Sequence, residues 1–390
     1  MPQTVSIVSI ASLSPLGNTK ESVWEKYLTN QHCFVTKEFN KQKEFVAILN
    51  SDCQKEIEDL KQFDHKYKSL DLSVLYALAA SRRAVAQSGW DKNAVFGVNL
   101  GSSRGATELF EKYHQEFLAT GKAQTLASPT TTLGNISSWV AHDLQSQGPE
   151  ISHSITCSTA LHAMLNGVAW LRSGMATKFL VGGSEAPLTD FTIAQMKALK
   201  IYASTNEDGH NQWPCKAFDL EKEVNSLILG EGAAVCCLET GKSNSALAFI
   251  EGVGYATEIL EHNISISTEA ICFQKSMKMA LKDIEPSDVD VIVMHAPGTK
   301  AGDLTEYKAI QKVFGNHLPM LTTNKWMIGH TFGASGMLNV EMAILMMQHQ
   351  QFIGVPFASI QQSNRKSIKK VLINAVGFGG NAVSILLSKD

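Results

Sequence analysis

Hydrophobic residues along the chain fall into short strand-like runs that alternate with longer segments at helical spacing. Runs of roughly four to eight apolar or alternating positions predict strands, and apolar positions about three or four residues apart predict helices. The expected strands cover residues 5–10, 95–100, 151–155, 179–182, 233–238, 289–294, 371–375 and 382–387. The expected helices cover residues 71–88, 107–118, 160–172, 271–281, 304–313 and 337–348. This alternation favours an α/β fold built in layers.

The second part of the chain repeats the pattern of the first. A strand that runs into a glycine-bearing turn near residues 98–102 recurs near residues 294–298, and residues 179–183 parallel residues 376–380. The unit around Cys157 is likewise echoed by a glycine turn and helix around His330. A repeat of this kind indicates a duplicated fold. We therefore expect two similar α/β halves, residues 1–244 and 245–390, with a functional site where equivalent ends of the halves meet.

The composition limits the class of function. The 34 basic and 37 acidic residues leave a net charge of −3 without a long basic block, which argues against nucleic-acid binding. No apolar stretch reaches the length of a membrane span, and the first residues lack a signal-peptide pattern, so we expect no membrane association and a cytoplasmic location. The seven cysteines are scattered without a C-x-x-C pair, which disfavours disulfides and a metal site.

Cys157 stands out because it lies between a strand-like run and a helical pattern that is apolar on most faces. At the N-terminus of a buried helix, unpaired N–H groups and the helix dipole favour a thiolate and can bind a developing oxyanion. Cys157 is therefore a candidate nucleophile. The alternative interpretation is a buried structural cysteine.

Two histidines lie in glycine-rich turns, which suggests close approach of the backbone to a ligand. His295 ends an apolar strand, and His330 stands between Gly329 and Gly333. They could act as a general base with an orienting group, or as paired neutral donors that stabilise an enolate. A third glycine-rich turn, at residues 377–380, can aim backbone N–H groups into a site.

In combination, these segments resemble β-ketoacyl-acyl carrier protein synthases of the elongating type, which are condensing enzymes with the thiolase fold. The resemblance runs from residues 6–17 to the glycine-rich turn at residues 377–380, essentially the full length. It implies duplicated α/β halves in a layered αβαβα arrangement. The matching motifs lie, in order, at Cys157 and His162; at residues 215–219 and 230–233; at His295, Thr299, Gly302, Asp303 and Glu306; and at Lys325, Gly329, His330, Gly333 and Gly336.

The resemblance implies a decarboxylative Claisen condensation in two stages. An acyl group passes from a carrier-protein thioester to Cys157, and the enolate formed by decarboxylation of a malonyl thioester then attacks it. His295 and His330 would hold the malonyl thioester and stabilise the enolate. Lys325, paired with Glu306, would keep the site electrostatically poised.

Substrate handling is also implied by the resemblance. The N–H groups of Cys157 and Phe378 would form the oxyanion hole, the Phe378 side chain would gate the acyl pocket, and Thr299 would hydrogen-bond the pantetheine arm. The family needs no bound metal or other cofactor, because the acyl carrier protein brings the substrate on its phosphopantetheine arm. The depth of the acyl pocket would be set by side chains contributed across the dimer interface, near residues 107–118 and 196–202.

The implied partner is an acyl carrier protein, which is acidic, so a basic patch would steer its docking. Lys66 and Lys68 resemble the docking region of the family. The equally good alternative is that they are solvent-exposed residues just before a helix. We expect a homodimer, with a heterodimer containing a chain-length-factor-like subunit as the alternative.

Several positions depart from the family pattern. Ala296 and Pro297 replace the usual residues after the first histidine, Asn339 replaces a glutamate, and the segment at residues 222–227 appears two residues longer. These departures suggest a specialised synthase, of a polyketide or aryl-polyene type, more than a housekeeping fatty-acid enzyme. Two alternatives are a chain-length-factor-like subunit, against which Cys157 and both histidines argue, and a cysteine hydrolase, which would leave Lys325 unexplained.

Overall fold

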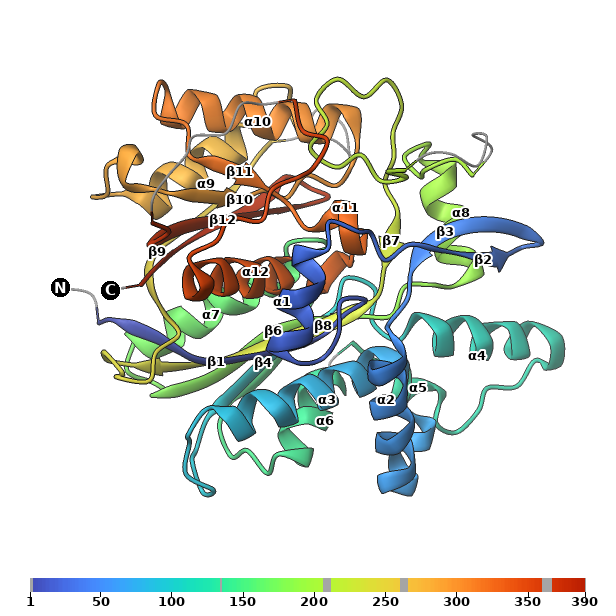
Figure 1. The fold of residues 1–390 in the computed structure, drawn as a ribbon. Helices are drawn as coiled ribbons and strands as arrows, with labels where there is room; N and C mark the ends of the chain where they lie inside the picture. Colours follow the sequence, from blue (N-terminus) through green and yellow to red (C-terminus); the bar gives the residue numbers. More distant parts are fainter. Residues whose placement is uncertain (1–2, 134, 206–211, 260–265, 360–366, 390) are drawn as a thin grey trace.

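A single ten-stranded sheet runs through the protein in this computed structural model, which describes residues 3–133, 135–205, 212–259, 266–359 and 367–389. Its strand order is β11-β10-β12-β13-β9-β1-β8-β6-β4-β5 (Figure 1). From one edge to the other, the strands are β11 (Met320–Thr322), β10 (Val291–Val293), β12 (Lys370–Gly377), β13 (Asn381–Ser388), β9 (Ala248–Thr257), β1 (Val5–Leu13), β8 (Gly232–Thr240), β6 (Lys178–Glu185), β4 (Gly97–Gly101) and β5 (Glu150–His153).

The two ends of this sheet have the same topology. On one side of the centre, β1 pairs antiparallel with β8 and β8 with β6, and then β6, β4 and β5 run parallel. On the other side, β9 pairs antiparallel with β13 and β13 with β12, and then β12, β10 and β11 run parallel. Among the described strands, the two half-sheets pair with each other where residues Val5 to Ile7 of β1 lie against Ala248 to Ile250 of β9. The expectation of duplicated α/β halves is therefore confirmed.

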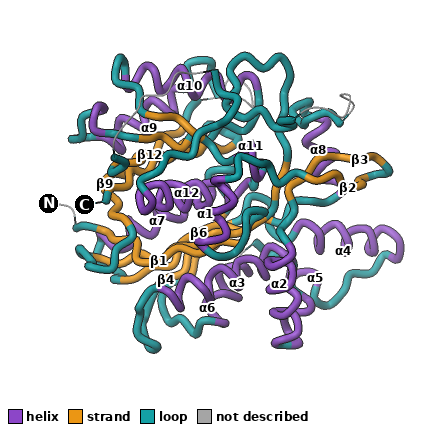
Figure 2. Tube along the Cα trace, in the orientation of Figure 1, coloured by secondary structure: helices purple, strands orange, loops and turns teal. Residues whose placement is uncertain are grey.

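Helices cover both half-sheets and fill the space between them, which gives five layers of αβαβα type (Figures 1 and 2). The helices are α1 (Lys20–Leu28), α2 (Ser51–Phe63), α3 (Leu72–Gln87), α4 (Thr107–Thr120), α5 (Ala127–Thr131), α6 (Asn135–Asp143), α7 (Thr159–Arg172), α8 (Asp190–Ala198), α9 (Ile271–Leu281), α10 (Lys300–Phe314), α11 (Lys325–Ile328) and α12 (Ser335–His349). Helices α9 and α10 lie outside one half-sheet, α3 and α6 lie outside the other, and α7 and α12 pack between them.

The central layer explains why some helical patterns are apolar on every face. All residues of α12 from Ser335 to Met347 are buried, and α7 buries Ala160, Leu161, Met164 and Val168 among others. A helix between two sheets has no solvent side, so it needs no polar stripe. The N-terminal ends of both central helices point toward the region between the halves, where Cys157 and His330 lie.

Most predicted elements are present, with ends shifted by a few residues. The sequence patterns missed α1, α2, α5, α6, α8, α11, β9 and β11, as well as a small sheet of β2 (Val35–Phe39), β3 (Gln42–Ala47) and β7 (Leu229–Gly230). Strand β9 was missed because it carries Gly252 and Gly254, which weaken a strand pattern. A Cβ on these glycines would lie 1.8 and 1.9 Å from carbonyl oxygens of α9, so the helix packs directly on the strand backbone.

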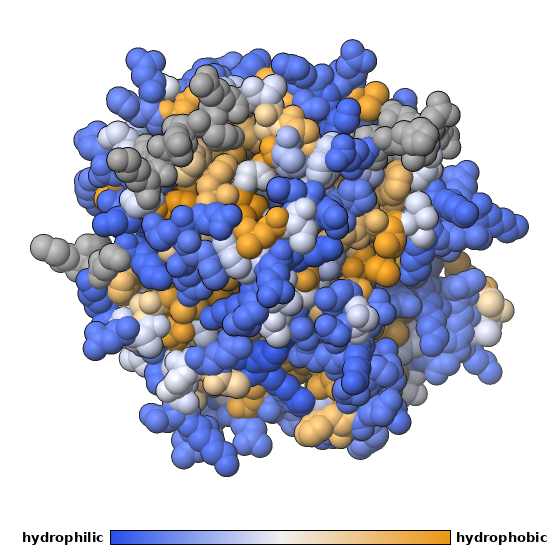
Figure 3. Space-filling model, in the orientation of Figure 1, coloured by the Kyte–Doolittle hydropathy of each residue, from blue (hydrophilic) through white to orange (hydrophobic). Residues whose placement is uncertain are grey.

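Hydrophilic side chains cover most of the face seen in Figure 3, and hydrophobic residues show between them in scattered patches. Within the described part of the chain, no helix combines the length and the apolar character needed to cross a bilayer. The same residues contain no group of three or more His, Cys, Asp or Glu side chains arranged to hold a metal ion.

Candidate active site

Cys157 lies in a tight turn between β5 and α7 and is almost fully buried, with 6 % of its surface exposed. Thr156, just before it, adopts a left-handed backbone conformation with φ of 47°, which is uncommon for a β-branched residue. The Thr159 hydroxyl accepts a bond from Ile155 N at 2.9 Å and donates one to Thr156 O at 2.6 Å. These local bonds hold the strained turn and fix the direction of the thiol.

The glycine-rich turn at residues 378–380 connects β12 to β13 and packs against the Cys157 turn. A Cβ on Gly377 would lie 1.9 Å from Thr156 Oγ1 and 2.7 Å from Ile155 O. No side chain fits there, so only glycine allows this approach. Phe378 follows at the wall of the cavity with 41 % of its surface exposed.

The pKa of Cys157 differs from the sequence-based expectation. Burial raises the pKa of this thiol to about 12, the negative charge of Glu185 raises it further, and the positive charge of Lys325 only partly offsets both. Burial therefore opposes the lowered thiol pKa expected at the helix N-terminus, because a thiolate in this enclosed position is desolvated.

His295 and His330 come from the other half of the chain and lie against each other. Their ring centroids are 5.2 Å apart, and the ring planes are nearly perpendicular at 84°. Burial, followed by the charge of Lys325, holds the pKa of both imidazoles well below the usual range. Both rings are thus neutral, which favours the interpretation as paired neutral donors over a base that forms a stable imidazolium.

Each histidine is held through its main chain. The amide of His330 donates to Ile228 O at 2.7 Å, and His330 O accepts from Gly230 N at 3.2 Å. Glu306 of α10 accepts from His295 N at 2.9 Å and from Ala296 N at 2.8 Å. Ala296 has a φ of 26°, so the departure at residues 296–297 is accommodated by a left-handed turn.

The expected direct pairing of Lys325 with Glu306 does not form. Among the described residues, Lys325 Nζ has no hydrogen-bond partner, and the Glu306 carboxylate is occupied by backbone amides and by Asn374 Nδ2 at 3.3 Å. Glu306 still acts on Lys325 through space. Burial lowers the pKa of Lys325 and raises that of Glu306, while each charge partly restores the ionisation of the other.

One cavity of about 290 Å³ brings most of the predicted residues together. Its walls include Cys157 from one half and His295, Thr299, His330 and Phe378 from the other. Lys325 and Glu306 are buried outside the cavity lining. Lys325 acts electrostatically on both histidines, and Glu306 acts on Lys325. Thr299 caps α10 by accepting from Gly302 N at 3.2 Å, which leaves its hydroxyl proton available to a ligand.

The apolar lining agrees only in part with the expected pocket. Met196, Leu199 and Ile201 line the cavity, as expected for residues 196–202, whereas no residue of 107–118 does so in this single chain. Phe332 was not singled out from the sequence, although it lies two residues after His330, and its ring is 5.3 Å from the His330 ring. Its position beside a candidate histidine in a glycine-rich turn was the sequence feature that could have identified it as a cavity residue.

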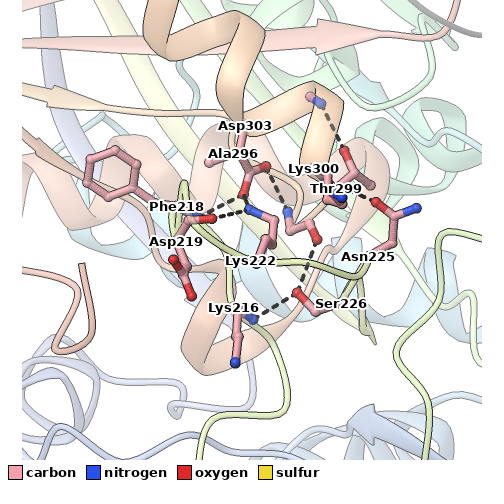
Figure 4. A network of polar contacts seen from close by, with 12 residues as sticks. Lys216, Phe218, Asp219, Lys222, Asn225, Ser226, Ala296, Thr299, Lys300 and Asp303 are labelled. Atoms are coloured by element: carbon pink, nitrogen blue, oxygen red, sulfur yellow. Dashed lines mark hydrogen bonds and ion pairs between the residues drawn. The ribbon is translucent and has the colours of Figure 1, made fainter. Parts of the chain in front are cut away.

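The longer segment at residues 222–227 is tied to the His295 turn (Figure 4). Lys222 Nζ donates to the buried carboxylate of Asp303 at 2.6 Å, and Asp303 also accepts from Gly298 N at 3.0 Å. Ser226 N donates to Gly298 O at 2.9 Å, and Asn225 Oδ1 accepts from Lys300 N at 2.9 Å. The unusual segment thus supports the turn on which His295 stands.

The structure also places Asn339, which departs from the family pattern, and the two lysines expected to dock the carrier. Asn339 is fully buried, donates from Nδ2 to Met294 O at 3.3 Å, and has no partner for Oδ1 among the described residues. Lys66 and Lys68 are exposed on a 3₁₀ turn (His65–Ser69) outside the cavity. Lys66 instead borders a larger, shallower hollow of about 810 Å³ beside Trp139 and His142, whose described lining includes no cysteine.

Comparison with known proteins agrees with this geometry. Residues 3–244 match the family described as beta-ketoacyl synthase, N-terminal domain, and residues 247–356 match the corresponding C-terminal domain. A 3-oxoacyl-[acyl-carrier-protein] synthase 2 of Vibrio cholerae is 26 % identical over 418 residues, which cover 99 % of both chains.

Two solved structures share the fold over the whole of both chains. One is described as a type II PKS acyl-carrier protein in complex with its ketosynthase bound to the hexaketide, with a TM-score of 0.85 and 20 % identity. The other is the ishigamide ketosynthase/chain length factor, with a TM-score of 0.84 and 20 % identity.

Proposed function

Because this chain belongs to the beta-ketoacyl synthase family, we propose that it is a 3-oxoacyl-[acyl carrier protein] synthase in which Cys157 is the acyl acceptor. The observation that carries this proposal is the shared cavity, where one buried thiol faces two neutral imidazoles from the opposite half. The reaction lengthens an acyl chain with a two-carbon unit from a malonyl thioester. It would serve a fatty-acid or a polyketide or aryl-polyene type pathway.

In the first stage, the Cys157 sulfur attacks the carbonyl carbon of an acyl thioester, and the carrier's thiol leaves. The proton of the Cys157 thiol must be removed as the carbon–sulfur bond forms, since the pKa of the thiol is raised to about 12. A neutral imidazole of the cavity can accept it and deliver it to the departing thiolate. The N–H groups of Cys157 and Phe378 would bind the oxyanion that forms on the carbonyl oxygen.

In the second stage, the bond between the malonyl carboxylate and its α-carbon breaks, and carbon dioxide leaves. The electron pair stays on the thioester as an enolate, whose α-carbon then attacks the acyl carbon on Cys157 and releases the thiolate. His295 and His330 would donate hydrogen bonds to the enolate oxygen, which is possible because neutral imidazoles each keep one N–H. Lys325, buried behind them, would favour the negative charge of the enolate.

A cysteine hydrolase fits these contacts less well. Such an enzyme needs a third group that orients its histidine base. Here the Nδ1 atoms of His295 and His330 have no hydrogen-bond partner in the described ranges.

The substrate would arrive on the phosphopantetheine arm of an acyl carrier protein. Thr299 at the cavity wall offers a hydroxyl donor to the amides of that arm. Lys66 and Lys68 are exposed and could contact an acidic carrier, so we retain them as the proposed docking residues. No resident metal or cofactor is needed for the two stages.

We propose that each chain consists of two halves, residues 1–244 and 245–390. We also propose that two copies of the chain form a homodimer. Strand β5 is an edge strand, and α4 buries only Thr107 while Phe110, Phe117 and Leu118 are 60 %, 48 % and 71 % exposed. Exposed apolar side chains on a helix and an unpaired strand edge are each typical of a protein interface. A chain-length-factor-like partner at the same surface is the alternative, and light scattering of the purified protein separates the two.

Intact-protein mass after incubation with acyl-loaded carrier proteins tests the proposal. The protein should gain the mass of the acyl group, and Cys157→Ala should not. Failure of the folded, dimeric protein to accept any acyl group would contradict its action as a stand-alone synthase.

A further inference from the structure

Glu185, at the end of β6, is a buried carboxylate that accepts four hydrogen bonds at once. Its Oε1 accepts from Ser102 Oγ at 2.8 Å and from Arg104 N at 3.1 Å. Its Oε2 accepts from Ser103 N at 2.7 Å and from Gly333 N at 2.9 Å. Three of these donors belong to the same half of the chain as Glu185, and the fourth belongs to the turn that follows His330.

The two segments that Glu185 joins are in close backbone contact. A Cβ on Gly333 would lie 2.6 Å from Ser103 N and 2.8 Å from Glu185 Oε2. A Cβ on Gly183 would lie 2.4 Å from Gly333 O. No side chain can enter this contact, so the position of the turn after His330 depends on the bonds to Glu185. Phe332, inside the turn, has a φ of 41°, which such bonds help to hold.

We propose that Glu185 is a positioning residue that fixes the His330 turn against the half of the chain that carries Cys157. Through this one hydrogen-bonded junction, the carboxylate sets the distance between the Cys157 thiol and the His330 ring. This inference rests on the proposed synthase function, because it assigns His330 to the decarboxylation stage.

The chemistry of the junction requires a carboxylate. An ionised carboxylate only accepts hydrogen bonds, and its two oxygens together accommodate four donors. A glutamine would turn an NH₂ group toward backbone N–H donors in either orientation of its amide, which leaves at least one buried donor unsatisfied. Burial raises the pKa of Glu185 to about 7, and the four donors oppose this rise.

The turn that holds Cys157 does not depend on Glu185 in the same way. It is held by the Thr159 hydroxyl and by the Ser158 hydroxyl, which donates to Ile155 O at 2.9 Å. Loss of Glu185 should therefore affect the two stages unequally. Acylation of Cys157 should persist, since loss of the Glu185 charge removes one cause of the raised pKa of that thiol. Decarboxylation of the malonyl thioester, which needs His330 in place, should slow.

The test compares Glu185→Gln with Glu341→Gln, a second fully buried carboxylate, whose bond from Ser12 Oγ at 2.7 Å has no link to the His330 turn. Three quantities are measured in the full-length protein: the acylation rate of Cys157, the rate of carbon dioxide release from malonyl-loaded carrier, and amide hydrogen exchange in peptides covering residues 99–106 and 328–336. We expect Glu185→Gln to slow carbon dioxide release on the order of ten- to a hundredfold, to slow acylation by no more than about threefold, and to speed exchange in both peptides. Glu341→Gln should change none of these selectively.

Equal losses in both stages, or unchanged carbon dioxide release, would overturn the assignment. If Glu185→Gln does not fold, Gly333→Ala breaks the same junction from its other side and is expected to give the same unequal loss. If the unsubstituted protein performs neither stage, the proposed function fails, and hydrogen exchange alone then decides the inference: unchanged exchange at residues 328–336 in Glu185→Gln would reject it.

Discussion

Gly377 lies directly against Thr156, so that a Cβ on Gly377 would be 1.9 Å from the Thr156 hydroxyl oxygen. These residues belong to opposite halves, and Thr156 immediately precedes the candidate nucleophile. We predict that Gly377→Ala displaces the Cys157 turn and lowers its acylation rate at least about tenfold, with a stability loss of about 1–3 kcal/mol. Gly354→Ala, whose Cβ would meet only the Phe352 ring at 3.2 Å, is the control. Normal acylation of Gly377→Ala, measured by intact mass, would contradict this role.

The two histidines should matter for one stage more than the other. Replacement of His295 or His330 by alanine removes a neutral donor to the enolate, so carbon dioxide release should fall on the order of a hundredfold or more. Acylated Cys157 should still form, although more slowly. The exposed His317→Ala serves as the control. Release that is as fast in either variant as in the control would exclude that histidine from enolate stabilisation.

The reactivity of Cys157 should depend on pH as expected for a weakly acidic thiol. Its pKa is raised to about 12, mainly by burial, so the thiolate is a small fraction at neutral pH. The alkylation rate by iodoacetamide, followed by mass, should rise roughly tenfold per pH unit from about pH 7 to about pH 10 without a plateau. Lys325→Met removes a charge that favours the thiolate and should slow alkylation below about pH 8, where Lys325 is protonated. A plateau near pH 8.5 would show that the thiol is ordinary.

The buried ion pair of Lys222 and Asp303 should be costly to break. Both side chains are almost completely buried, with 2 % and 0 % exposed, and the Nζ–Oδ2 distance is 2.6 Å. Lys222→Met leaves a buried carboxylate without its partner and should lower the free energy of unfolding in urea by about 3–5 kcal/mol. The exposed pair of Lys61 and Glu58 offers a control, since Lys61→Met should cost less than about 0.5 kcal/mol. Similar losses in the two variants would refute the prediction.

Glu341 should make the protein less stable as the pH rises. Burial raises its pKa from 4.5 to about 7, so between these values the native state holds a proton that the unfolded state has lost. Its stabilising contribution is therefore complete below about pH 4.5 and is lost as the pH rises through about 7. Glu341→Gln cannot ionise and should unfold in urea with a free energy on the order of 2–3 kcal/mol higher than the parent at pH 8, but not at pH 4.5. A gain of equal size at both pH values would point to another cause.

Hydrophobic patterns predicted the alternating strands and helices, and glycine positions pointed to the turns that carry His295, His330 and Phe378. The αβαβα arrangement and the place of Thr299 came from the resemblance to the family. The apolar runs of α7 and α12 are visible in the sequence because a helix between two sheets is buried on all sides. His295 and His330 were identified by the glycines beside them, since close packing of main chains requires glycine. These signals are local, so a single sequence carries them.

What the sequence could not provide depends on distance and burial between remote segments. The raised pKa of Cys157 reflects how completely the site is enclosed, and the local helix N-terminus gave the opposite expectation. Glu306 was expected to bond Lys325, but backbone amides of residues 295 and 296 reach it instead. Glu185 carried no signal at all, because its four donors lie on two segments far from it in the chain.

The contact surface between the two halves also constrains how each half can change during evolution. A gene duplication normally frees one copy to drift while the other keeps the original task. Here neither copy is free, because Gly377 in one fits against Thr156 in the other, and Gly333 in one bonds to Glu185 in the other. A substitution on one side of this contact surface changes the packing of the residue opposite. The halves can therefore diverge in sequence only as far as each accommodates changes in the other.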